Sequence, residues 1–203
     1  MNRFKKESFS GWEGKTQRGN ILLKGSGHQW GTTLIYLQHK VNFALHQNNE
    51  KMKKASIEPF TVIGIAVRTT NENGQAAKEI GELWARFMNE NVLDAIPNKI
   101  DSTVYSLYTD YDGDHTQPYT AILGCQVTNV NSIPIGMVGK SVSGGNYVKT
   151  TARGDLTKGF IANEWSKIWR MDLERTYTAD FEVFGEKAQN PTDAEIDFFI
   201  AVK

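Results

Sequence analysis

Apolar and polar residues follow the order strand, helix, strand, strand in the middle of the chain. Three segments are rich in β-branched and aromatic residues, which is typical of strands. One segment between them carries apolar residues at three- and four-residue steps, which is typical of an amphipathic helix. The predicted strands are 60–70, 102–111 and 119–127, and the predicted helix is 75–91.

The same order of patterns repeats in the last third of the chain. The second copy has predicted strands at 146–154, 175–186 and 194–203, and a predicted helix at 156–171 that Asp155 caps. The helices align as "IGELWARFM" over "IANEWSKIW", which matches Trp84 to Trp165. We therefore predict an α+β fold in which duplicated β-α-β-β units form a pseudo-twofold antiparallel sheet with two main helices. Neither unit can cover its own sheet alone, so a central groove between the units is the expected ligand site.

Residues 1–51 lack this patterning. They mix Gly, Gln, Asn, Lys and His without a sustained helical stripe, and they contain no helix-turn-helix pattern. We expect a weakly ordered N-terminal extension in front of a domain at 52–203. Met52 stands directly before the patterned region, and we hypothesise that the natural product starts there.

Charge is distributed unevenly although the whole chain has a formal net charge of zero. Residues 1–51 contain eight Lys or Arg and three Asp or Glu, a balance of +5, and residues 52–203 contain fifteen and twenty, a balance of −5. The acidic part is unsuited to direct contact with nucleic acid and suits a cationic ligand better than an anionic one.

Composition indicates a cytoplasmic location and no membrane association. The hydrophobic fraction of 39% suits a folded core, but no run of apolar residues is long enough for a signal peptide or a membrane span. The one cysteine, Cys125, excludes an internal disulfide and lies in an apolar strand pattern. The histidines show no spacing typical of a metal site, so we predict neither a metal nor another cofactor.

Two carboxylates stand in the apolar segment "YTADFEVFGE", which is residues 177–186. Side chains alternate along a strand, so Asp180, Glu182 and Phe184 should share one face. A carboxylate in such surroundings must face solvent, find a partner or serve a ligand. Burial would raise the pKa of Glu182, and a bound cation would restore its charged form.

Three tryptophans lie on the apolar stripes of the two predicted helices, namely Trp84, Trp165 and Trp169. Core packing is the simplest interpretation of such positions. A groove between the helices would still expose their edges, and an aromatic wall is what a flat or cationic ligand needs.

Several linked motifs in residues 55–203 resemble the GyrI-like effector-binding domains. They are "IEPFTVIGIAVRTTNENG", "IGELWARFM", "IPNKIDSTVYSLYTDYDGD", "YTAILGCQV" and "YTADFEVFGEKAQNPTDAEIDFFIAVK". The branch that these motifs most resemble comprises AraC-type regulators and stand-alone YdeE-like proteins, and it is related to the ligand-binding domain of the BmrR regulator. The family fold agrees with the duplicated unit.

The resemblance implies a ligand site. Multidrug-binding members hold lipophilic cations with a glutamate on the penultimate strand and with aromatic side chains. Glu182 occupies that place in "DFEVF", and Tyr147 and Phe199 lie where wall residues are expected. Together with the motif analysis, the candidate ligand-binding residues are Glu182, Tyr147, Trp84, Trp165, Trp169, Phe184 and Phe199.

The expected function is that of a small-molecule sensor domain without a DNA-binding module of its own. Its expected partner is an amphipathic, cationic small molecule, and a separate transcription regulator is a further candidate partner. Two alternatives remain open at this point. Some GyrI-like proteins are hydrolases, for which Glu182 would act as a general base on water, and the member that gives the family its name acts on DNA gyrase as an interaction module.

Overall fold

The computed structural model of the chain describes residues 16–17, 20–21 and 52–203. The predicted extension at 1–51 therefore falls largely outside the described residues, and it stays a prediction. The same holds for the hypothesis that the natural product starts at Met52.

The chain divides into two units, Met1–His46 and Gln47–Lys203. In the first unit, the two-residue strands β1 (Thr16–Gln17) and β2 (Asn20–Ile21) pair antiparallel. The second unit contains all other described elements.

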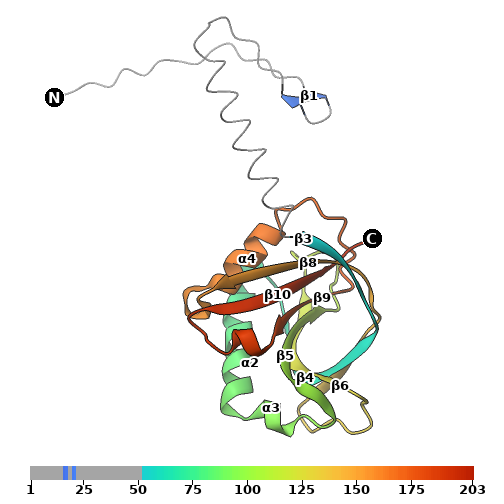
Figure 1. The fold of residues 1–203 in the computed structure, drawn as a ribbon, viewed down its shortest axis with the longest axis vertical. Coiled ribbons are helices and arrows are strands. Elements are labelled where there is room, and N and C mark those ends of the chain that lie inside the picture. The colour runs from blue at the N-terminus through green and yellow to red at the C-terminus, as the bar shows by residue number, and fades with distance from the viewer. Residues whose placement is uncertain (1–15, 18–19, 22–51) are drawn as a thin grey trace, which may run out of the picture. The chain divides into compact units, whose positions relative to one another are not determined.

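An eight-stranded antiparallel sheet is the framework of the second unit (Figure 1). Its spatial order is β3-β8-β10-β9-β5-β6-β4-β7. The two copies therefore meet at the central pair β9–β5, with β10 and then β8 next to β9, and β6 and then β4 next to β5. The strands are β3 (Met52–Ile57), β4 (Phe60–Thr69), β5 (Lys99–Thr109), β6 (Tyr119–Val127), β7 (Val138–Val142), β8 (Gly145–Gly154), β9 (Ala179–Phe184) and β10 (Ala194–Ala201). This order confirms the predicted pseudo-twofold arrangement of duplicated units.

Each copy has one strand more than the sequence pattern predicts. β3 precedes β4 along the chain but pairs with β8 of the other copy, and β7 precedes β8 but pairs with β4. The two copies thus exchange their first strands. Both added strands lie at sheet edges and contain Lys, Ser or Gly, so they lack the apolar alternation of a half-buried strand.

Two main helices lie on one side of the sheet, which we call the helix face (Figure 1). They are α2 (Gln75–Asn89) and α4 (Phe160–Ile168). α2 is followed by the short α3 (Val92–Ala95), and single 3-10 turns lie at η1 (Glu72–Gly74), η2 (Leu156–Lys158) and η3 (Glu186–Ala188).

The second predicted helix is interrupted near its start. The Asp155 side chain accepts a hydrogen bond from the Thr157 amide at 2.9 Å, and so it caps η2, not α4. Gly159 then adopts a left-handed conformation with φ of 69°, which breaks the helix before Phe160.

Apolar side chains fill both faces of the sheet. On the helix face, α4 contributes Phe160, Trp165 and Ile168, while α2 contributes Leu83 and Phe87. The opposite face has its own buried cluster, which consists of Val62, Leu107, Ile122, Val142, Tyr147, Ala179, Phe181 and Ala201. Cys125 is buried in β6, as its sequence pattern predicts.

None of the helices in the described residues combines the length and the apolar character that crossing a membrane requires.

Candidate functional site

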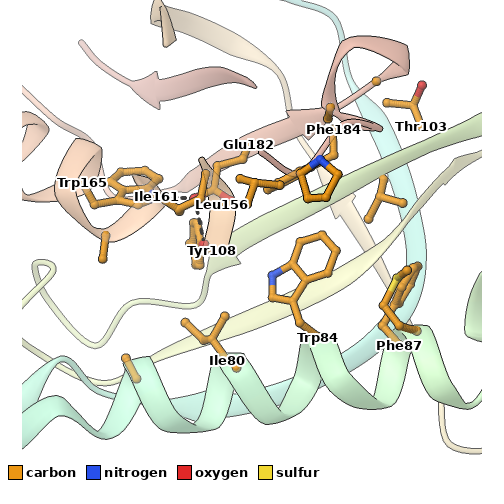
Figure 2. Close-up of a pocket in the computed structure, with 18 of the residues that line it drawn as sticks. Ile80, Trp84, Phe87, Thr103, Tyr108, Leu156, Ile161, Trp165, Glu182 and Phe184 are labelled. Carbon is orange, nitrogen blue, oxygen red and sulfur yellow. Dashed lines mark hydrogen bonds between the residues drawn. The ribbon is translucent and has the colours of Figure 1, made fainter. Parts of the chain in front are cut away.

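A groove with a volume of about 1330 Å³ lies between α2 and α4. The central strands β5 and β9 form its floor, and Figure 2 shows aromatic and aliphatic side chains rising from both helices toward it. Six of the residues that form its walls and floor are Ile80, Trp84, Tyr108, Trp165, Glu182 and Phe184. The predicted groove between the two copies is therefore present.

Glu182 lies at the inner part of this groove, on β9. Its side chain is buried, with 1% of the residue exposed. The Tyr108 hydroxyl donates a hydrogen bond to Oε1 at 3.0 Å, and the Trp165 indole N–H donates a second one to the same oxygen (Figure 2). No residue in the range 52–203 forms a hydrogen bond with Oε2, which leaves that oxygen available to a ligand.

Burial dominates the electrostatics of Glu182. Loss of hydration raises its pKa from 4.5 to about 7, although the hydrogen bonds from Trp165 and Tyr108 act in the opposite direction. The carboxyl group therefore changes charge near neutral pH. A cation in the groove would favour its ionised form.

Tyr108 is fixed as a hydrogen-bond donor by its own surroundings. The Ser106 hydroxyl donates to the Tyr108 oxygen at 3.0 Å, and the Trp165 ring meets the Tyr108 ring edge-to-face at 5.3 Å. Burial and the nearby Glu182 carboxylate hold the pKa of Tyr108 well above its usual value, so its hydroxyl keeps its proton. Because Ser106 pairs with Glu182 across β5 and β9, the strand register itself positions this cluster.

Aromatic rings form the walls of the groove at two places. Trp84 from α2 meets Phe184 from β9 edge-to-face at 4.8 Å. Toward the other end, Trp169 after α4 stacks on His115 at 5.1 Å with an interplanar angle of 19°. Both pairs present polarisable faces or edges to the cavity, which suits a lipophilic ligand.

Asp180 has a different role from that of Glu182, although it lies only two residues away. It is fully buried and forms an ion pair with Arg175, whose Nη2 atom lies 2.5 Å from Oδ2. The Tyr111 hydroxyl and the Ala201 amide each donate to Asp180 at 2.9 Å. Both oxygens are thus occupied within the protein, and Asp180 stabilises the junction between β9 and β10.

The matched family agrees with this geometry. Residues 55–202 match the family Cass2, whose description is integron-associated effector binding protein. The chain belongs to the Cass2 family. This match covers most of the second unit and includes all the strands and helices that form the groove.

Solved structures and one curated protein extend the comparison. The integron cassette protein VCH_CASS2 of Vibrio cholerae is 31% identical, with a TM-score of 0.58 over 75% of this chain and 96% of that chain. SAV2435, solved bound to tetraphenylphosphonium, has a TM-score of 0.62 at 14% identity and covers 75% of this chain and 93% of its own. YobU of Bacillus subtilis (strain 168) is 23% identical over 144 residues, which are 69% of this chain and 90% of YobU.

These matches confirm the predicted resemblance to the GyrI-like effector-binding domains and the predicted α+β fold. Five of the seven candidate ligand residues line the groove together, and that they bind a ligand stays a prediction. They are Glu182, Trp84, Trp165, Trp169 and Phe184.

The other two candidates, Tyr147 and Phe199, do not lie in the groove, and their prediction as walls of the Glu182 site needs correction. Side chains alternate along β8 and β10, so both residues point to the opposite face of the sheet. There Phe199 stacks on Phe181 at 4.7 Å, and Tyr147 packs against the same ring at 5.4 Å. Tyr147 is buried in the core of that face.

Sequence reasoning missed Tyr108 and His115 as groove residues. For Tyr108 the sequence held one usable signal. It lies two residues after Ser106 in a predicted strand, so these two polar side chains share a face. His115 had none, because its position depends on how the turn between β5 and β6 folds back toward Trp169.

Proposed function

We propose that residues 52–203 bind a lipophilic, cationic small molecule in the groove, with the Glu182 carboxylate as its counter-charge. The observation that carries this proposal is a buried glutamate at the base of a large aromatic cavity. In apolar surroundings a carboxylate without a cationic partner is costly, and the protein provides Glu182 with hydrogen-bond donors but with no ion pair among residues 52–203.

The charge of the groove lining supports a cation over an anion. Four carboxylates line the cavity, and no Lys or Arg of the described residues does so. At about 4 Å and an effective dielectric constant of about 20, a cation would gain roughly 4 kcal/mol from Glu182 before its own desolvation is subtracted. SAV2435, which shares the fold, was solved bound to the lipophilic cation tetraphenylphosphonium.

The biological role that fits this binding is that of a sensor domain in transcription regulation. EcmrR, solved in a complex with DNA, shares the fold with a TM-score of 0.51 at 12% identity, and it covers 84% of this chain and 65% of its own. A separate transcription regulator is therefore our candidate partner for this domain once its ligand is bound.

Tetraphenylphosphonium titration tests the proposal directly. We expect this cation to bind in isothermal titration calorimetry and to raise the melting temperature by mass action. Triphenylphosphine oxide, which is aromatic but neutral, should bind far more weakly. Glu182→Gln should lose most of the affinity while it remains folded, and Glu174→Gln, which removes an exposed charge outside the groove, should retain it. Equal affinity of the Glu182→Gln variant and the wild type would refute the counter-charge role.

One observation favours hydrolysis as a second candidate function. A carboxyl group with a pKa of about 7 can act as a general base at neutral pH, and Oε2 of Glu182 is available to a water molecule. Incubation with a panel of reactive small molecules, followed by mass spectrometry, should then show hydrolysed products with the wild type and none with Glu182→Gln. Binding without product formation would exclude this second function for the compounds tested.

A further inference from the structure

The groove extends well beyond Glu182. On the far side of the Trp84–Phe184 contact, three further carboxylates line the same cavity: Asp94 of α3, Asp101 of β5 and Glu186 of η3. All three are exposed, whereas Glu182 is buried. The cavity therefore has one buried acid at its inner end and a group of acids at its mouth.

Strand register places two of the outer acids at the same end. Ser106 pairs with Glu182, and Val104 and Phe184 form the last pair of the two strands. Asp101 precedes Val104 and Glu186 follows Phe184, so both lie beyond this end of the paired segment. With a rise of about 3.3 Å per residue, four residues separate Glu186 from Glu182 by at most about 13 Å. Asp101 lies five residues from Ser106, which is at most about 17 Å along β5.

The outer acids are not neutralised by the protein. None of them forms an ion pair with any residue of 52–203, and no Lys or Arg in that range lines the groove. Lys99, which is near Asp101 in sequence, donates instead to the backbone oxygens of Leu93 and Ile96 at 2.7 and 2.8 Å. At the inner end, the buried Glu182 also has one oxygen without a hydrogen-bond donor in this range.

The middle of the groove is apolar. Trp84 from α2 contacts Phe184 from the floor strand β9 between the inner and outer carboxylates, and Phe87 and Val104 line the cavity near them (Figure 2 labels the first three). A chain of methylene groups or a flat ring system would fit such a segment, but a hydrated charge would not.

We propose that the preferred ligands are elongated dications, with one charge at Glu182 and the second at the outer acids Asp94, Asp101 and Glu186. This inference rests on the proposed function, because it assumes that Glu182 receives a cation. It adds a second recognition point and a length requirement. The outer acids are exposed, so each contributes only modestly to the binding free energy of the second charge. The higher affinity for a dication therefore depends on several carboxylates acting together.

Decamethonium and decyltrimethylammonium provide the test. Both have an unbranched chain of the same number of carbon atoms and one trimethylammonium group for Glu182, but only decamethonium has a second cation for the mouth of the groove. Their affinities are measured by calorimetry for the wild type and for Asp101→Asn/Glu186→Gln. The Asn keeps the acceptor that holds the Thr103 amide. Asp172→Asn/Glu174→Gln is the matched control, since it removes two exposed acids that do not line the groove.

We expect Asp101→Asn/Glu186→Gln to weaken decamethonium by about five- to tenfold and to leave decyltrimethylammonium within about twofold. The matched control should change neither, and hexamethonium, which is shorter, should gain less from the outer acids. Equal losses for both ligands in Asp101→Asn/Glu186→Gln would overturn the dication proposal while leaving the proposed function intact. Failure of both ligands and of tetraphenylphosphonium to bind the wild type would overturn both proposals.

Discussion

Cation affinity should depend on pH through Glu182. Tetraphenylphosphonium has no titratable group, so any pH dependence of its binding must come from the protein. The pKa of Glu182 is raised to about 7 by burial, and a cation binds its ionised form. At a pH of about 5, two units lower, only about 1% of this carboxyl is ionised, which corresponds to about 2.7 kcal/mol, or roughly a hundredfold loss of affinity. Above a pH of about 8, affinity should no longer change.

Calorimetric titrations at constant ionic strength measure this profile. Glu182→Gln should bind weakly and with an almost flat profile. His115 also lines the groove and would gain charge at low pH, although burial lowers its pKa from 6.5. His115→Gln therefore separates the two groups, and it should retain most of the slope. A wild-type affinity that stays constant across this range, or a slope that disappears with His115→Gln, would refute the assignment to Glu182.

Four further outcomes follow from the same contacts. In the absence of ligand, the folded state holds the Glu182 proton more tightly than the unfolded state does. The free energy of unfolding should therefore fall by about 3 kcal/mol as pH rises from 4.5 to about 7. Denaturant titrations should show this decrease in the wild type but not in Glu182→Gln. Tyr108→Phe removes one donor to Oε1, which should raise the pKa of Glu182 and move the midpoint of the affinity profile up by roughly one unit. Asp180→Asn breaks a buried ion pair with Arg175 and should cost about 3–5 kcal/mol, visible as a large drop in melting temperature; an unchanged melting temperature would contradict the structural role of the pair. Phe199→Leu alters only the opposite face of the sheet, so tetraphenylphosphonium should bind it as well as the wild type, and a large loss of affinity would contradict the placement of Phe199 outside the groove.

Periodicity alone was sufficient to predict the duplicated core of this fold. The predicted strand 119–127 coincides with β6, and the predicted strand 60–70 differs from β4 by one residue. Both strands are buried on both faces along most of their length, so they stand out as dense runs of apolar and β-branched residues. β3 and β7 lie at edges and exchange between the copies, and short edge strands leave no comparable pattern.

The sequence pattern predicted which side of its own helix or strand a residue occupies. It did not predict which residues of other elements it contacts. The positions of Trp84 and Trp165 in the groove follow from their helical stripes, and that of Glu182 from the penultimate strand. Tyr147 and Phe199 were placed by resemblance, and only the register of β8 and β10 assigns them to the opposite face. Asp180 and Glu182 share a face in sequence, yet their partners, Arg175 and Tyr108, come from the coil before β9 and from β5. Which carboxylate is neutralised internally is thus a property of tertiary contacts.

Direct titration of the Glu182 side-chain carboxyl by ¹³C NMR, with and without tetraphenylphosphonium, tests the central claim most closely. Without ligand the carboxyl should titrate with a midpoint near its raised pKa of about 7. With saturating ligand the midpoint should fall by one unit or more, on the order of the stabilisation expected from a nearby cation. A midpoint that stays in place while the cation is bound would mean that the ligand lies elsewhere and that Glu182 is not its counter-charge.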